Sequence, residues 1–147
     1  MRVEVSTRLE VDAPPERVYG ALVDWERQGE WVPLTTVRVL EGDGTVGSLV
    51  EAVTALGPFR LVDLMRVGQL EAPYRIKVLH CGKQLKGPGL LECTRLPADR
   101  TRLTWAESLD VPAVVGFCWP VLRPFGALLL RAGLKRLARN LARPVAA

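Results

Sequence analysis

Hydrophobic and polar residues alternate along most of the first 110 residues of the chain. In residues 3–11 the odd positions are apolar or small, which is the two-residue period of a strand with one buried face. Similar patterns predict six further strands, in residues 36–41, 48–56, 59–67, 74–81, 87–96 and 101–110. The turns between these six are rich in glycine, proline and aspartate and too short for a crossover helix, so consecutive strands are predicted to be antiparallel.

Two short helices are predicted between the first and second strands. The segment Asp12-Ala13-Pro14-Pro15-Glu16 has the composition of a helix start, because prolines fit the first turn and an acidic side chain suits the positive end of a helix. Apolar residues follow at helical spacing, and a second short helix around residues 26–31 is predicted to end before Pro33.

The chain ends in a predicted long amphipathic helix, in residues 126–143, where leucines recur at positions 130, 134, 137 and 141. Pro124 is expected to open its regular part, since inside a helix proline removes a hydrogen bond and collides with the preceding turn. One face of the sheet needs a cover, and only this helix is long enough to supply it. We therefore predict a single α+β domain over residues 1–147, a curved seven-stranded antiparallel sheet wrapped around the C-terminal helix.

The composition is that of an ordinary globular domain. Hydrophobic residues make up 48% and charged residues 24% of the chain, which excludes disordered, collagen-like and low-complexity proteins. The longest uncharged stretch, residues 111–122, is far shorter than the roughly 20 residues that cross a bilayer. The N-terminal residues alternate instead of forming a basic region followed by an apolar run, so no secretory signal is predicted and a cytoplasmic location is expected.

No metal, cofactor or disulfide is predicted. Cys81, Cys93 and Cys118 form an odd set without C-x-x-C spacing, and only one histidine could join them in a zinc site, so they are expected to be reduced and mostly buried thiols. Residues 42–47 match the phosphate-binding pattern G-x-G-x-x-G, but a predicted strand follows instead of a helix, which indicates a hairpin loop. Residues 83–89 are likewise expected to be a turn.

Several segments together resemble one protein family. They are Val11-Asp12-Ala13-Pro14-Pro15-Glu16-Arg17-Val18-Tyr19, then Leu22, Asp24, Trp31 and Pro33, and finally Thr101-Arg102-Leu103-Thr104-Trp105. The sequence is similar over nearly its whole length to the START/Bet v 1-like (SRPBCC) superfamily, in particular its polyketide cyclase/dehydrase branch. The resemblance implies a helix-grip fold with a cavity for hydrophobic small molecules between the sheet and the last helix. It fixes no reaction, because members include aromatase/cyclases and lipid carriers, and no catalytic motif of the family can be carried over residue by residue.

Strand periodicity indicates which polar side chains point into such a cavity. In the fifth predicted strand the inward set of alternating residues continues to His80, and in the fourth Asp63 falls on the apolar face. If their hairpin places Met65 opposite Val78, then Asp63 lies opposite His80, where its carboxylate would orient the imidazole and favour the protonated form. These two residues are predicted as a catalytic acid–base pair; the alternative is that His80 only satisfies a structural hydrogen bond.

A larger set of side chains is predicted to bind the ligand. It consists of Trp31, Phe59, Leu61, Met65, Val78, Trp105, Glu107, Phe117, Trp119, Phe125 and Leu130. Aromatic rings stack on flat partners, although plain core packing accounts for each of them equally well. Gly116, Gly126 and Gly133 leave gaps beside the helix that favour a pocket. Glu107 is expected to point inward and to anchor a ligand hydroxyl group or the terminal helix, with Arg123 as its candidate partner.

Positive charge is concentrated at the C-terminal end. The net charge is +4, from 20 basic and 16 acidic side chains, and residues 111–147 contain no acid. Arg131, Lys135, Arg139 and Arg143 are spaced four apart, opposite the leucine face. This basic face is either solvated or makes peripheral contact with an anionic membrane. Nucleic acid is not an expected partner, because no aromatic-rich basic strand or helix-turn-helix pattern accompanies the charge.

The expected function is binding of a hydrophobic small molecule, polyketide-like or lipidic, by a carrier or binding protein that is a monomer or weak homodimer. The alternative is a cyclase/dehydratase of the lyase type that uses His80 and Asp63. Contact between these two residues inside an open cavity favours the enzyme, whereas a lining of apolar atoms favours the carrier. A regulatory partner of another protein would need an exposed apolar patch.

Overall fold

The computed structural model describes residues 1–142 and confirms the predicted order of helices and strands along the chain, apart from one additional helix, α2. Seven strands form one antiparallel sheet in the order β1-β7-β6-β5-β4-β3-β2. The strands are β1 (Arg2–Val11), β2 (Thr35–Glu41), β3 (Leu49–Leu56), β4 (Phe59–Glu71), β5 (Arg75–Cys81), β6 (Lys86–Leu96) and β7 (Arg100–Asp110). The helices are α1 (Pro15–Leu22), the 3-10 helix η1 (Trp25–Glu30), α2 (Ala113–Phe117) and α3 (Trp119–Ala142). The predicted α+β class and the two short helices after the first strand are confirmed.

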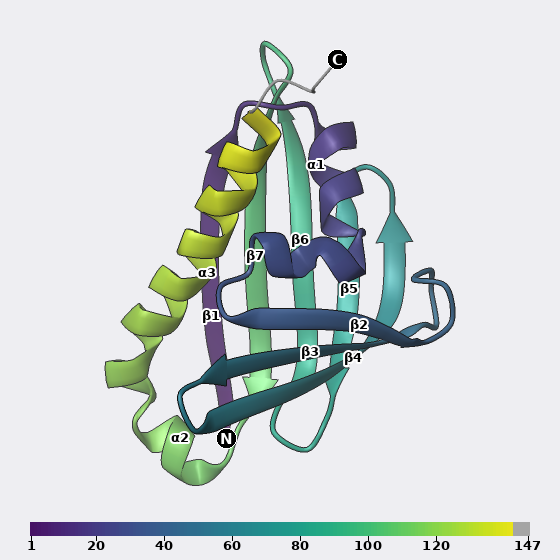
Figure 1. Cartoon of the computed structure of the whole chain (residues 1–147). Helices are drawn as coiled ribbons and strands as arrows, with labels where there is room; N and C mark the ends of the chain where they lie inside the picture. The colour runs from purple at the N-terminus through teal and green to yellow at the C-terminus, as the bar shows by residue number, and fades with distance from the viewer. Residues whose placement is uncertain (143–147) are drawn as a thin grey trace.

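The sheet is strongly bent, and α3 lies along one of its edges (Figure 1). β1, β7, β6 and β5 run along the long axis of the molecule, β2 and β3 run across it, and α3 lies along β1. Two irregularities accompany the bend: the β4–β5 register shifts between Val67 and Gln69, and the β2–β3 register shifts between Val39 and Glu41. An extra residue in one strand bends that strand and increases its twist.

The larger cluster of buried residues lies where the second half of α3 meets the sheet and α1. Leu134 and Leu137 of α3 are buried in one cluster with Leu22, Ile76 and Leu103. Burying a leucine side chain contributes about 1.5–3 kcal/mol, so this contact holds the helix on the sheet. The first half of α3 has no such buried leucines, and a cavity lies between it and the sheet.

The start of the C-terminal helix differs from the prediction. α3 begins at Trp119, so Pro124 lies inside it, and the unpredicted helix α2 precedes it. Pro120 already occupies the first turn, where a backbone N–H would have no partner in the helix, and Val121 N donates to Cys118 O at 3.0 Å. The helix continues through Pro124 without the one hydrogen bond that the proline nitrogen cannot donate.

The two glycine-rich segments have different conformations. Residues 42–47 lie in the hairpin loop between β2 and β3, as predicted, with Gly42, Gly44 and Gly47 at positive φ. The expected turn over residues 83–89 is wrong in its second half, because β6 begins at Lys86. Gly89 lies inside this strand, next to the side chains of Glu107 and His80.

The cysteines are all free, but they are not mostly buried as expected. Cys93 is buried, and burial raises the pKa of its thiol to about 12, whereas Cys81 and Cys118 are exposed. Within residues 1–142, no helix has the length and apolar character to span a membrane.

Candidate functional site

A largely apolar cavity of about 350 Å³ lies between the sheet and the first half of α3. All seven strands contribute side chains to its wall, together with η1, α2 and α3. The four tryptophans of the chain, Trp25, Trp31, Trp105 and Trp119, all line it. Trp31 and Trp105 meet edge to face, with ring centroids 6.0 Å apart. The cavity therefore presents large flat apolar surfaces to its interior.

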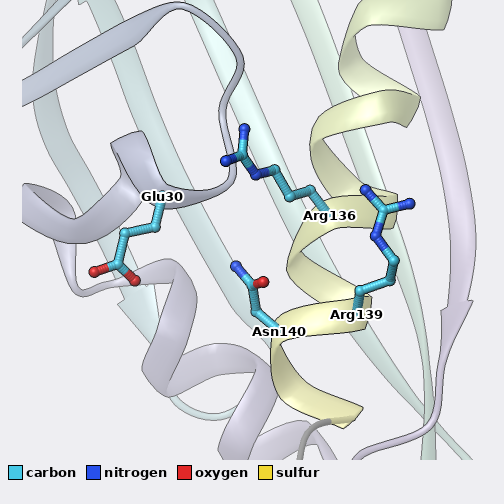
Figure 2. A pocket seen from close by; sticks show the side chains of 4 residues that line it. All are labelled: Glu30, Arg136, Arg139 and Asn140. Carbon is cyan, nitrogen blue, oxygen red and sulfur yellow. The ribbon is translucent and has the colours of Figure 1, made fainter.

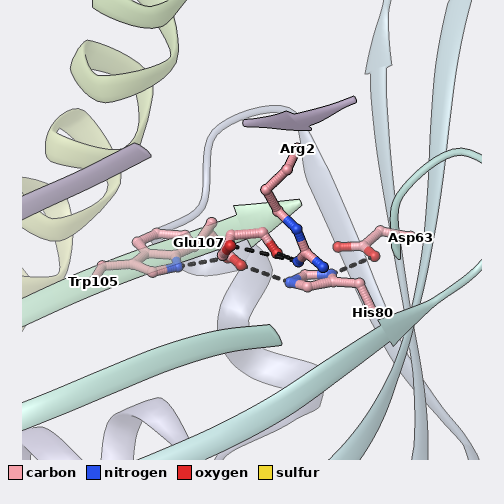
Figure 3. Close-up of polar contacts among 6 residues, drawn as sticks. Arg2, Asp63, His80, Trp105 and Glu107 are labelled. Atoms are coloured by element: carbon pink, nitrogen blue, oxygen red, sulfur yellow. Dashed lines mark hydrogen bonds and ion pairs between the residues drawn. The ribbon is translucent and has the colours of Figure 1, made fainter. Parts of the chain in front are cut away.

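One wall of the cavity carries a buried cluster of three ionisable side chains (Figure 3). His80 of β5 is only 4% exposed; its Nδ1 lies 2.7 Å from Asp63 Oδ1 of β4, and its Nε2 lies 2.7 Å from Glu107 Oε2 of β7. Trp105 Nε1 donates to the other oxygen of Glu107, Oε1, at 2.7 Å. A continuous chain of hydrogen bonds thus links three strands of the sheet.

The structure contains the predicted contact between Asp63 and His80, although the predicted register is wrong. Met65, not Asp63, is paired with His80, and Val67 is paired with Val78. The error is an even number of residues, which keeps each side chain on its predicted face, and Asp63 reaches the imidazole diagonally. At the turn Glu71 pairs with Arg75, three residues away from the predicted register, and the one-residue bulge between Val67 and Gln69 reduces the difference to two. Strand alternation fixes the face but reveals neither the position of the turn nor the bulge.

Glu107 points inward as expected, but its partner is not the predicted one. It accepts hydrogen bonds from His80 and Trp105, and no ion pair joins it to Arg123 in residues 1–142. Arg123 is exposed on α3. The carboxylate therefore stabilises the cavity wall and not the start of the helix.

Gly89 makes the contact between Glu107 and His80 possible. β6 lies between β5 and β7, and Gly89 is paired with Val78 on one side and with Glu107 on the other. A Cβ atom at this position would lie 2.6 Å from Glu107 Oε2 and 3.0 Å from His80 Nε2. A side chain here would separate the two groups, so the intervening strand has to carry glycine. Strand alternation does not predict this role of Gly89; a glycine inside a predicted strand was the available signal.

The surroundings of His80 determine its charge. Burial lowers the pKa of the imidazole, but the hydrogen bonds and negative charges of Asp63 and Glu107 outweigh burial and raise this pKa to about 10. His80 is therefore an imidazolium at neutral pH, with both N–H groups directed to carboxylates. Burial also raises the pKa of Asp63, against the opposing effect of His80. Asp63 Oδ2 has no hydrogen-bond partner in the described chain, so it is the open position of the cluster.

Most of the predicted ligand-binding side chains line the cavity. Besides Asp63 and His80, these are Trp31, Leu61, Met65, Val78, Trp105, Glu107, Trp119 and Leu130. Three do not: Phe59, Phe117 and Phe125 are 75%, 84% and 68% exposed. Phe59 begins β4 at the tip of the β3–β4 hairpin, and the other two lie on the outside of α2 and α3. Because α2 and the start of α3 carry apolar residues on both sides, their sequence pattern does not distinguish inward from outward positions.

Three glycines were expected to leave gaps beside the helix, and they lie in different surroundings. Gly126 lines the cavity. Gly133 packs against the backbone of Trp31, and the space beside Gly116 is filled by the Met1 side chain. Only Gly126 therefore enlarges the cavity.

Three neutral polar side chains that were not among the predicted site residues also reach the cavity. They are Gln28, Thr35 and Thr54. The two threonine hydroxyls lie 2.8 Å apart, and Gln28 Nε2 donates to Leu22 O at 2.8 Å. The strand alternation of the threonines was a usable signal. No group of three or more histidine, cysteine, aspartate or glutamate side chains in residues 1–142 is arranged to hold a metal ion.

The predicted basic face of α3 lies outside the cavity. Lys135 and Arg139 are exposed, and Arg131 donates to Arg8 O of β1 at 2.8 Å, while Arg143 lies outside the described residues. A second, polar groove runs between η1 and the end of α3 (Figure 2). It is lined by Glu30, Arg136, Arg139 and Asn140. This groove offers charge but little apolar surface, so it does not suit a hydrophobic ligand.

Comparisons with known proteins agree with this architecture. Residues 2–142 match the family model described as polyketide cyclase/dehydrase and lipid transport. A conserved protein from Geobacillus kaustophilus superposes with a TM-score of 0.79 at 18% identity over 95% of each chain. An aromatase/cyclase from a Streptomyces species superposes with a TM-score of 0.77 at 18% identity, over 100% of this chain and 98% of the other. A truncated norcoclaurine synthase from Thalictrum flavum gives 0.75 at 13% identity, over 99% and 96%.

At such identities the solved structures show a shared fold, and they confirm the predicted helix-grip architecture. No curated protein matches the sequence.

We predict that His80 remains protonated throughout the neutral range. It is the only histidine of the chain, so NMR of isotope-labelled protein observes its ring nitrogens without overlap. They should titrate with a midpoint near pH 10. Glu107→Gln removes one carboxylate and Gly89→Ala separates it from the ring, so both variants should lower this midpoint. Because the pKa is raised on folding, the associated stabilisation is complete below the ordinary value of about 6.5 and is lost as the pH rises through 10.

The matched control is Glu4→Gln, which neutralises an exposed carboxylate on β1 and should leave the midpoint unchanged. A wild-type midpoint near the ordinary histidine value, about 6.5, would contradict the described cluster.

Proposed function

The chain belongs to the polyketide cyclase/dehydrase and lipid transport family, and we propose that it binds an apolar small molecule as a carrier or binding protein. The cavity between the sheet and α3 is the observation that carries this proposal. Its volume of about 350 Å³ lies within the range of small-molecule sites, and its lining is mostly apolar. A ligand there would add dispersion contacts to the lining side chains and stabilise the folded state.

A polyketide-like or lipidic molecule suits this lining. The indole rings of Trp31 and Trp105 offer faces and edges for a flat or chain-like hydrocarbon, while the cluster around His80 supplies the polar groups that fix its orientation. A cytoplasmic location is part of the same proposal. It is supported by the free thiols of Cys81 and Cys118, which are exposed and would be kept reduced there.

Ligand binding should be visible in the fluorescence of the protein itself. Because all four tryptophans line the cavity, a neutral probe such as N-phenyl-1-naphthylamine should quench their emission as its own emission rises. Gly126→Leu should weaken binding by about tenfold or more, since its new side chain enters the cavity, where a Cβ has no neighbour closer than 3.9 Å.

The matched control is Gly20→Leu in α1, where an added Cβ also meets nothing within 4 Å but the position is exposed and outside the cavity. Equal loss of binding in both variants, or none in either, would count against the cavity as the binding site.

We further propose that the carrier exchanges its ligand at an anionic membrane. α2 and the first half of α3 expose apolar side chains away from the cavity, here called the outer apolar face. It consists of Val114, Phe117, Val121, Phe125 and Leu128, each more than half exposed. The opposite side of the same segment, with Trp119 and Gly126, lines the cavity. Helices that are apolar on both sides are ordinarily covered, and exposed apolar patches of this kind mark interaction surfaces.

Charge indicates what covers this outer apolar face. Arg123 is exposed in the same segment of α3, Lys135 and Arg139 follow along the helix, and the sequence has no acidic residue after Asp110. A protein surface that is both apolar and positive complements the interface of a bilayer with anionic headgroups. Contact there would place the cavity next to the hydrocarbon from which a lipidic ligand comes.

Sedimentation with vesicles tests the membrane proposal. Binding should be strong to vesicles containing phosphatidylserine and weak to phosphatidylcholine alone. Phe117→Ser combined with Phe125→Ser should reduce it by about tenfold or more, because each exposed phenylalanine contributes apolar area to the contact. Leu79→Ser removes an exposed apolar side chain of β5 and should have no effect. Binding that ignores lipid charge, or a dimer that buries the same face in solution, would contradict the membrane contact.

A cyclase/dehydratase is the second candidate, favoured by the open oxygen of Asp63. Both nitrogens of His80 are held by carboxylates, so His80 suits a positioning residue better than a proton acceptor. Asp63 Oδ2 lies where a ligand can contact it. The pKa of Asp63 is raised, so it is closer to neutral pH than that of an ordinary aspartate, which suits a group that accepts and returns a proton. In this candidate function Asp63 would remove a proton beside a carbonyl and return it to the hydroxyl that leaves as water.

A small β-hydroxyketone separates the two candidates. The bicyclic compound 3-hydroxy-1-tetralone loses water to give 1-naphthol, whose fluorescence reports the reaction. If the protein is an enzyme of this kind, it should accelerate the reaction, and Asp63→Asn should lower the rate by about a hundredfold or more. No acceleration by the wild type, or full activity in Asp63→Asn, would leave binding without catalysis as the function.

A further inference from the structure

The charged side chains that line the cavity have a net negative charge, because the positive charge of His80 balances only one of the two carboxylates. Asp63, His80 and Glu107 are the charged side chains of its lining, and no arginine or lysine of residues 1–142 lines it. His80 is the one group that carries positive charge, and both of its nitrogens already contact carboxylates. Two carboxylates around one imidazolium leave one negative charge without a counter-ion.

The cluster has an open hydrogen-bond acceptor but no open donor. Glu107 accepts from His80 and Trp105 through its two oxygens, and Asp63 accepts from His80 through Oδ1 alone. Every N–H of the cluster is therefore already used, and what remains open in the cluster is an acceptor, Asp63 Oδ2. Elsewhere in the described lining the buried Trp31 Nε1 also lacks a partner, but it is an uncharged donor. The side chain of Asp63 is 15% exposed and lies on the cavity wall, where a bound ligand can reach it.

We propose that the cavity selects apolar ligands that carry an O–H or N–H donor, such as a phenol, an alcohol or a protonated amine, and that it excludes ligands with a carboxylate. This inference rests on the proposed binding function and names the ligand class of the same site. The donor lies against Asp63, and the apolar body of the ligand lies along Trp31 and Trp105. Among lipidic ligands, a fatty alcohol is favoured over a fatty acid.

The physical reason is the absence of any compensating cation in the described lining. A carboxylate brought into the cavity would lose its hydration beside a group that is already negative, and the one imidazolium has no N–H left to donate. A hydroxyl or ammonium group instead supplies the hydrogen bond that Asp63 Oδ2 lacks. A plain hydrocarbon gains the apolar contacts but not this bond, so its affinity lies between the two.

Four compounds with the same naphthalene body test this selectivity at neutral pH. They are 2-naphthol, 2-naphthylmethylamine, 2-methylnaphthalene and 2-naphthoate. Calorimetry gives the affinities, and the indole N–H signals of the four tryptophans show by NMR that each compound enters the cavity. We expect 2-naphthol and the amine to bind about tenfold or more tightly than 2-methylnaphthalene, and 2-naphthoate to bind most weakly.

Two variants connect the selectivity to the cluster. Asp63→Asn removes the unbalanced charge and adds donors, so it should bring the affinities for 2-naphthol and 2-naphthoate close together. Asp99→Asn, an equal change at an exposed aspartate between β6 and β7, should preserve the difference.

The outcomes separate this inference from the function on which it rests. If 2-methylnaphthalene binds in the cavity while 2-naphthol and 2-naphthoate bind equally, or if their ratio is the same in Asp63→Asn as in the wild type, the selectivity is overturned and the binding function stands. If none of the four compounds shifts the indole signals, the binding function is overturned and the selectivity falls with it.

Discussion

A protonated histidine held between two carboxylates inside an apolar cavity is the interaction on which the rest of the structure depends. Charges removed from water are tolerated only when they are paired and hydrogen-bonded, and His80 meets this condition with one partner on each ring nitrogen. Its partners come from β4 and β7, so the contact needs a sheet curved enough to bring these inward faces together. It also needs Gly89 on the strand between, because any side chain there would fill the space that the carboxylate crosses.

α3 divides the concave side of the sheet into a filled part and a cavity. Leu134 and Leu137 of its second half complete the packed core, whereas Gly126 and Trp119 of its first half border the cavity. A tightly packed interior is the normal state of a protein, so the cavity reflects the small side chain at Gly126 and the limited reach of the residues opposite. The same first half carries apolar side chains on its outer side, which links the cavity to the proposed membrane contact.

The carrier and the enzyme share this cavity and differ in what Asp63 does. Two observations were expected to distinguish them, and the structure contains both in part: Asp63 contacts His80 inside the cavity, and the rest of the lining is mostly apolar. The decisive detail is that His80 has no free nitrogen. A buried imidazolium with two carboxylate partners orients both carboxylates and favours their ionised form. Asp63 Oδ2 is then the atom that contacts a ligand, whether by hydrogen bonding alone or by proton transfer.

The sequence alone determined the seven strands, the terminal helix and the inward positions of Asp63, His80 and Glu107, because the two-residue and 3.6-residue periods follow directly from local backbone geometry. Short turns determined that consecutive strands from β2 to β7 are antiparallel, whereas the pairing of β1 with β7 is known only from the tertiary structure. Only the tertiary structure decided which of these side chains meet. The bulge in β4 moved the pairing so that Met65 lies opposite His80, and the contact with Glu107 crosses a strand that lies between the two residues. It also decided that Phe117 and Phe125 face outward, since a helix that is apolar on all sides has no pattern to orient it. Periodicity specifies the face of each element, whereas contacts between elements depend on register, curvature and the absence of a side chain at one glycine.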